Sequence, residues 1–123
     1  MTNEEMSELD QWLAENVMGW RFRKRIPHVF GAPPAYVIDI GTEEQDFVMY
    51  VEDWTPTRNI AQAFEVVEKM EKNGFCFELS DSPFQTWDAI FEFQLNKKEF
   101  AIGAIETPAL AICLAAKKAW EAK

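Results

Sequence analysis

The stretch TRNIAQAFEVVEKMEKNGFCFEL, residues 57–79, decides how this chain folds, because its apolar period changes partway along it. Apolar side chains first recur every three or four residues, as on the buried face of a helix. After Gly74 they alternate with polar ones, as in a strand with one buried face. Gly74 stands where a helix would end in a left-handed residue. The stretch therefore predicts a helix from about residue 57 and a strand directly after Gly74.

The same patterns continue on both sides of this stretch. They predict helices at residues 3–18, behind a capping-box pattern, and at about 108–121, behind Thr107-Pro108. Strand-like runs lie at residues 36–40, 47–51, 75–79, 87–95 and 100–103, and the first four form two hairpins. Residues 20–25 are either an edge strand or an ordered loop. We predict an α+β fold, an antiparallel sheet of four to five strands packed by three helices, in one domain of residues 1–123.

Composition and charge limit the classes of partner. The 123 residues are 48% hydrophobic, with five Trp and ten Phe, which is enough to build a core. Twenty-one acids against twelve bases give a net charge of -9, which disfavours nucleic acids and anionic membranes as partners. The chain opens without a signal-like segment and its longest apolar run is short, so we expect a cytoplasmic protein. The aromatic surplus predicts self-association, most simply a two-fold dimer.

The periodic segments also predict which side chains form the interior. Eight large residues on their apolar faces are expected to be largely buried, namely Trp12, Phe64, Val67, Phe75, Phe77, Phe91, Phe93 and Ile112. Cys76 and Cys113 stand among apolar neighbours, which predicts two reduced cysteines in the core.

The residues that could carry catalysis do not form a constellation. His28 and the two cysteines lack the paired spacing of a zinc site, and a cysteine nucleophile would need His28 beside a thiol in an apolar run. The acids at residues 43–46, and Asp81 and Asp88 on either side of a second turn, are most simply solvated turn residues. The five glycines stand singly, without a phosphate loop. We therefore expect no metal and no cofactor, and binding in preference to catalysis.

Candidate binding residues lie where positive potential is concentrated. Four of the twelve basic residues fall within residues 21–25. Helices that begin near Thr57 and Thr107 present free N–H groups and a positive dipole end, which attract anions. Trp54 could add an aromatic plate, although a capped helix with a core tryptophan is the structural alternative. The predicted ligand-binding residues are Trp54, Thr57, Arg58 and Asn59 in one wall, Arg21, Arg23 and Arg25 in another, and Thr107.

Three stretches taken in order resemble one family. They are LAENVMGW at residues 13–20, WTPTRNIAQAFEVVEKM at 54–70 and ETPALAIC at 106–113. They resemble the phage ABA-sandwich domain, which often has Ser-Thr-Asp where this chain has residues 57–59, with a base and an amide in place of the last two. The resemblance implies an α/β/α-type sandwich and a phage origin, and it carries no established catalytic residues.

The resemblance and the phage origin it implies suggest an accessory role. We expect a non-enzymatic binding protein whose partner is a small anionic ligand or a host protein. Its most concrete form is an anti-defence protein that sequesters a small nucleotide-derived signal. One alternative is an inhibitor whose acidic surface mimics nucleic acid or docks a basic host protein. A small hydrolase is the third alternative.

Overall fold

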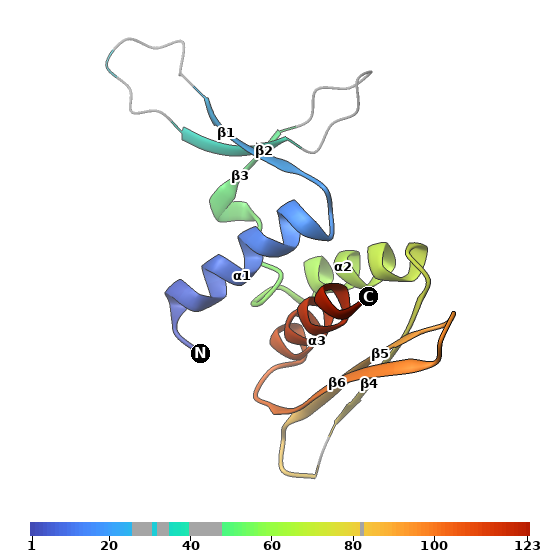
Figure 1. Ribbon diagram of the computed structural model, residues 1–123. Coiled ribbons are helices and arrows are strands. Elements are labelled where there is room, and N and C mark those ends of the chain that lie inside the picture. The colour runs from blue at the N-terminus through green and yellow to red at the C-terminus, as the bar shows by residue number, and fades with distance from the viewer. Residues whose placement is uncertain (26–30, 32–34, 40–47, 82) are drawn as a thin grey trace.

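Figure 1 shows the computed structural model, which describes residues 1–25, 31, 35–39, 48–81 and 83–123. His28 and the acids predicted to form a turn at residues 43–46 lie outside these residues. The elements in chain order are α1 (Asn3–Asn16), β1 (Arg21–Arg25), β2 (Ala35–Asp39), β3 (Val48–Tyr50), the 3-10 helix η1 (Val51–Asp53), α2 (Ile60–Lys72), β4 (Phe75–Asp81), β5 (Trp87–Phe93), β6 (Lys98–Ile105) and α3 (Pro108–Ala122). The predicted helices and strands are confirmed, and the basic run is a strand.

Side chains cap the start of each of the three α-helices. In α1 the Thr2 hydroxyl accepts from the Glu5 N–H at 3.1 Å, and the Glu5 carboxylate accepts from the Thr2 N–H at 3.3 Å. The Asn59 side chain accepts from the N–H of Gln62, the third residue of α2, and the Thr107 hydroxyl accepts from the N–H of Leu110, the third residue of α3. Because each cap satisfies a donor that the helix itself cannot pair, the chain enters each helix at a fixed residue. Helix α2 therefore begins at Ile60 and not at Thr57.

The strands form two sheets and not one. Strands β1-β2-β3 make one antiparallel sheet and β4-β5-β6 make another, so the expectation of a single sheet of four to five strands is wrong. The reason lies after β3, where η1 and the buried Trp54 lead the chain from β3 to α2. Strand β4 then begins on the other side of the helices and pairs with β5 instead of returning to β2.

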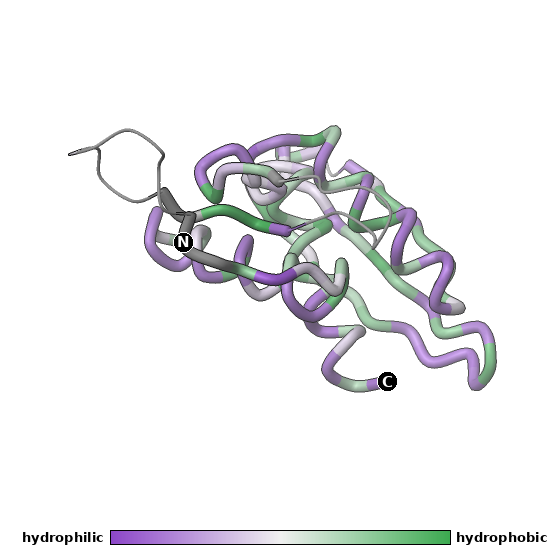
Figure 2. The backbone as a smooth tube through the Cα atoms, turned by 90° about the horizontal axis from the view of Figure 1, so that it is seen from above, coloured by the Kyte–Doolittle hydropathy of each residue, from purple (hydrophilic) through white to green (hydrophobic). Residues whose placement is uncertain are grey.

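The helices lie between the two sheets. Figure 1 shows α2 and α3 over one face of β4-β5-β6, while α1 lies between α3 and the β1-β2-β3 sheet. This order differs from an α/β/α sandwich, in which helices would cover both faces of one sheet. Along α2, hydrophobic residues recur every three or four positions between hydrophilic ones, as in a helix with one buried face (Figure 2). Among the described residues no helix is long and apolar enough to cross a bilayer.

One core joins residues of all three helices and of β2, β4 and β5. Of the eight side chains expected inside, Val67, Phe75, Phe91 and Ile112 are buried, and Trp12, Phe77 and Phe93 are partly buried. The expectation for Phe64 is wrong, because it is 42% exposed. Its neighbours Ala63, Val66 and Val67 take the inner face of α2. Phe64 instead meets Phe77 edge to face at the margin of the core, with 6.1 Å between ring centroids.

The two free cysteines have different surroundings. Cys113 is buried in α3 as expected, and burial raises the pKa of its thiol. Cys76 is exposed, which corrects the prediction that it belongs to the core. Alternation along β4 explains the difference, because Phe75 and Phe77 face the helices and the residue between them must face the other side of the sheet.

Candidate functional site

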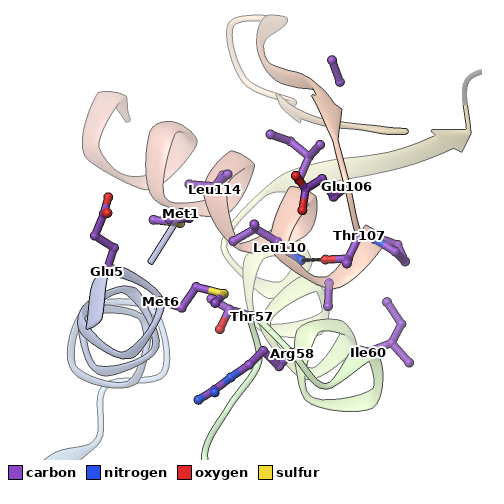
Figure 3. A pocket seen from close by; sticks show the side chains of 14 residues that line it. Met1, Glu5, Met6, Thr57, Arg58, Ile60, Glu106, Thr107, Leu110 and Leu114 are labelled. Carbon is purple, nitrogen blue, oxygen red and sulfur yellow. Dashed lines mark hydrogen bonds between the residues drawn. The ribbon is translucent and has the colours of Figure 1, made fainter. Parts of the chain in front are cut away.

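A pocket of about 850 Å³ lies where the starts of α1 and α2 meet the connection from β6 to α3. This volume is within the range of small-molecule sites. Most of its lining is apolar and includes Met1, Met6, Ile60, Ile105, Leu110 and Leu114. Figure 3 shows the Met6 side chain extending from α1 into the space bordered by Thr57 and Leu110. Three charged residues, Glu5, Arg58 and Glu106, also line the pocket.

The structure brings three of the predicted site residues together in this pocket. Thr57 and Arg58 line it from the segment before α2, and Thr107 lines it from the start of α3. Thr57 is only 1% exposed, whereas Arg58 is exposed. The Thr107 hydroxyl accepts from the Leu110 N–H at 3.3 Å, which is the dashed line in Figure 3. Two segments separated by some fifty residues in the sequence therefore supply one site.

Of the other predicted site residues, Trp54, Asn59 and Arg21 do not line the pocket. Trp54 is 2% exposed, and its ring packs edge to face against Trp20 with 4.7 Å between centroids. The expectation that Trp54 offers an aromatic plate to a ligand is therefore corrected, and the structural alternative holds. Asn59 caps α2, and Arg21 is exposed on β1. The side chains of Arg23 and Arg25 lie outside the described part of the chain, so a second wall of basic residues stays a prediction.

A buried carboxylate that the sequence did not indicate holds this part of the molecule together. Asp10 of α1 is 3% exposed. Its Oδ1 accepts from the Thr57 N–H at 2.9 Å and its Oδ2 accepts from the Thr57 hydroxyl at 3.1 Å. Its backbone oxygen accepts from Trp54 Nε1 at 2.8 Å. Burial raises the pKa of Asp10, and the hydrogen bonds from Thr57 and the charge of Arg58 partly oppose that rise.

No sequence signal could have revealed this role, because a single aspartate between helical apolar positions normally faces water. Only the approach of Thr57, 47 residues away, brings the Asp10 carboxylate into the interior. On the other side of the segment, Gln62 of α2 accepts from the Thr55 N–H at 2.7 Å and donates to the Asp53 carbonyl at 2.6 Å. Residues 53–59 are therefore held from both α1 and α2.

The hydroxyl groups of the pocket already have partners within the fold. Its described lining contains neither a histidine, a cysteine nor a lysine, and both of its threonine hydroxyls are hydrogen-bonded, Thr57 to the Asp10 carboxylate and Thr107 to the Leu110 N–H. Within the described part of the chain, no group of three His, Cys, Asp or Glu side chains could hold a metal ion. The Cys113 thiol is buried with a raised pKa, which suppresses the reactive thiolate. What the pocket offers is a guanidinium, two carboxylates and an apolar surface.

Comparison with known proteins gives one result. No curated protein and no solved structure shows significant similarity to the chain. The family described as the phage ABA sandwich domain matches residues 11–117, which covers most of the 123 residues. The match includes the Thr57–Arg58 wall and the Thr107 start of α3. The chain therefore belongs to the phage ABA sandwich domain family.

Proposed function

We propose that this protein is a non-catalytic phage accessory protein that binds a small nucleotide-derived ligand in the pocket between α1, α2 and α3. Its biological role would be to sequester a signal of a host defence pathway. The observation that carries the proposal is a pocket of about 850 Å³ with a guanidinium on one wall and an apolar interior. A mononucleotide has the matching parts, a charged phosphate and a flat, weakly polar base.

The charges of the pocket support this class of ligand in detail. Arg58 is exposed and can offer a planar pair of N–H donors to a phosphate. Glu5 and Glu106 would repel a second phosphate beside them, but carboxylates accept hydrogen bonds from ribose hydroxyls or from an exocyclic amine. The side chains of Met6, Leu110 and Leu114 would contact the base. Because the net charge is -9, an anion finds few other favourable surfaces on this molecule.

Thermal shift with a nucleotide library, followed by mass spectrometry of the retained ligand, tests the proposal. Ligand at a hundred times its Kd should add about 2.7 kcal/mol of stability, which raises the Tm by roughly 10 °C for a chain of this size. The nucleotide should be recovered unchanged. Formation of a product would instead identify a hydrolase, and the absence of any shift across mononucleotides, cyclic nucleotides and ADP-ribose would contradict the proposal.

A matched pair of charge reversals places the ligand. Arg58→Glu should weaken binding more than tenfold, or about 1.4 kcal/mol, with little effect on folding because the side chain is exposed. Arg21→Glu is the control, since Arg21 is also exposed but lies on β1 away from the pocket. If Arg21→Glu weakens binding and Arg58→Glu does not, the ligand binds at the basic strand.

A second candidate function, inhibition of a basic host protein, is favoured by the outer face of β4-β5-β6. Glu92 of β5 lies directly opposite Glu99 of β6, and Glu78 of β4 is exposed on its strand. Like charges in opposite positions destabilise a sheet. Lys97 Nζ, 3.9 Å from Glu92 Oε1, offsets part of this repulsion, and a basic partner would offset more of it. Glu99→Lys separates repulsion within the sheet from binding of a partner. The substitution should stabilise the fold slightly and abolish the binding of a basic partner. Equal binding by the variant would eliminate this candidate.

A further inference from the structure

We propose that Asp10 and Asp88, which do not line the pocket, are positioning residues that fix its two polar walls before any ligand arrives. The inference deepens the proposed function and rests on it for the ligand. Asp10 acts on the wall of Thr57 and Arg58. Asp88 acts on the wall that runs from Ala104 to Thr107.

The first wall is attached to α1 through Asp10 at three points. Both carboxylate oxygens accept from Thr57, and the backbone oxygen accepts from Trp54. Thr57 is almost fully buried, so its neighbour Arg58 starts from a fixed position beside the pocket. Glu5 and Met6, one turn before Asp10 on the same helix, line the opposite side. One carboxylate therefore sets the distance between two sides of the pocket.

The second wall begins at a bulge in the second sheet. Trp87 pairs with Ile105 and Ala89 pairs with Ile102, so Gly103 and Ala104 both oppose Asp88. Such a bulge adds one residue to its strand and changes which face the following side chains take. Phe100, Ile102 and Ile105 all pack against the core. Without the extra residue, Ala104 would turn inward and Ile105 would turn away from the core.

Asp88 holds that bulge in place. Its Oδ1 accepts from the Ala104 N–H at 2.9 Å. Ala104 has a φ of 60°, the left-handed conformation, which is strained for a residue that carries a Cβ. A Cβ at Gly103 would stand 2.8 Å from the same carboxylate oxygen, so glycine leaves the room that Asp88 needs. Ala104 itself lines the pocket, and backbone strain of this kind collects at ligand sites.

Asp10 and Asp88 each fix one wall of the pocket in the same way. Each accepts a backbone N–H from a residue of the pocket wall, and each comes from an element other than the one it holds. A site whose walls are fixed in this way does not lose conformational freedom when the ligand binds, which raises affinity. We therefore expect the pocket to be preformed, with Arg58 and Glu106 already in their binding positions.

Alanine and asparagine substitutions at each position test this inference with ADP-ribose as the probe. Asp10→Ala and Asp88→Ala should each weaken ADP-ribose binding by about tenfold or more, as expected when a positioning hydrogen bond is lost. Asp10→Asn and Asp88→Asn retain an amide oxygen that can accept the same N–H, so they should restore most of the affinity. Glu121→Ala, exposed near the end of α3 and outside the pocket lining, is the control and should bind as the unaltered protein does.

A double-mutant cycle separates positioning from general destabilisation. If Asp10 acts by placing Arg58, the double variant Asp10→Ala with Arg58→Gln should lose much less ADP-ribose affinity than the product of the fold-losses in the two single variants. For Asp88→Ala and Arg58→Gln, which act on different walls, the losses should multiply. Multiplicative losses in the Asp10 cycle would overturn the positioning role of Asp10.

Amide hydrogen exchange in the free protein gives a readout that does not need a ligand. Asp10→Ala should accelerate exchange at Thr57 by about tenfold or more, and Asp88→Ala should do so at Ala104, while the Leu110 amide is unchanged. Gly103→Ala should reproduce the Asp88 result. Uniform acceleration at all amides, or none at Thr57 and Ala104, would overturn the inference. If exchange responds as expected but ADP-ribose and mononucleotides fail to bind, the proposed function fails and the positioning of the walls stands.

Discussion

The two sheets of this protein are built in opposite ways. In β4-β5-β6 the strands are seven, seven and eight residues long, and α2 and α3 cover one face. In β1-β2-β3 the strands have five, five and three residues, and the neighbouring residues Val37 and Ile38 are both fully buried. Neighbouring strand residues point to opposite faces, so β2 is covered on both sides, although only Ile38 joins the main core.

This difference shows what an apolar pattern can determine. In β4 and β5, apolar residues occupy every second position. This pattern predicts a sheet with one buried and one solvent-exposed face, and it indicates which residues lie on each. The run YVIDI at residues 36–40, in which Val37 and Ile38 are adjacent apolar residues, predicts a strand but does not say what covers its two faces. The pocket lies where the helices between the two sheets meet, so changes on either side test how strongly the sheets depend on one another.

The largest loss of stability is expected in the second sheet. Phe91 is fully buried and contacts Phe75 and Phe77, whose ring centroids lie 6.3 and 4.9 Å away. Phe91→Ala should lower the free energy of unfolding by about 3–5 kcal/mol, because it removes these contacts and leaves a cavity. Urea denaturation measures the change. A loss below about 1 kcal/mol would show that this strand face is not the main core.

A smaller loss is expected in the first sheet. Ile38→Ala should lower the free energy of unfolding by about 2–4 kcal/mol, since Ile38 is fully buried but has a smaller side chain than Phe91. Far-ultraviolet and tryptophan signals should change together during unfolding if both sheets belong to one cooperative unit. Two separate transitions would show instead that β1-β2-β3 unfolds on its own.

The junction between the sheets should respond more weakly. Trp54→Phe keeps an aromatic ring in place but removes the Nε1–H that donates to the Asp10 carbonyl. The expected cost is about 1–3 kcal/mol, because the smaller ring leaves a cavity in the core and one hydrogen bond between this segment and α1 is lost. Asp10→Asn is the control in the same denaturation assay, because it changes the Asp10 side chain but keeps the backbone carbonyl that accepts from Trp54. No loss in Trp54→Phe would mean that this hydrogen bond does not hold α1 to the segment before α2.

The cap of α2 should contribute less again. Asn59→Ala removes the side chain that accepts from the Gln62 N–H at 3.2 Å, and it should cost about 1 kcal/mol. Because Asn59 does not line the pocket, ligand affinity should change little. Calorimetry measures the loss of stability, and the binding assay measures the change in ligand affinity. A large loss of affinity with little loss of stability would show that Asn59 belongs to the ligand-binding site.

The smallest expected effect is a dependence of stability on pH through Asp10. Its pKa is raised in the folded protein, mainly by burial, so the folded state binds this proton more strongly than the unfolded chain does. The Asp10 contribution is therefore most favourable below about pH 4, the ordinary aspartate pKa, and declines as pH rises to the folded pKa. The stability difference between the unaltered protein and Asp10→Asn, measured from low to neutral pH, should show this decline. A difference that grows with pH would mean that the pKa of Asp10 is lowered.

Much of the secondary structure could be predicted because its causes are local. The start of α3 follows from Thr107 and Pro108, and the end of α2 follows from Gly74, whose φ of 94° suits glycine. Pairing within the hairpin of β4 and β5 also follows from alternation over short separations. The exposed Phe64 and Cys76 were misjudged because an apolar neighbourhood in the sequence does not specify which way one side chain faces.

The site was only partly predictable for the same reason. Thr57, Arg58 and Thr107 could be proposed because helix starts attract anions wherever they lie. Their convergence on one pocket could not, since it depends on how α1, α2 and α3 pack. Trp54 could equally have been a ligand platform or a core residue until Asp10 accepted its N–H.

The sequence by itself determined the family, the helices and strands, the caps of α1 and α3, and the acidic charge. Each of these depends on residue types at short spacing, where backbone geometry leaves few alternatives. The tertiary structure alone decided that there are two sheets with the helices between them, that Asp10 is buried beneath Thr57, and that Asp88 supports a bulge at Ala104. These arrangements join residues far apart in the chain, and their free energy comes from shared burial and hydrogen bonds that no local pattern encodes.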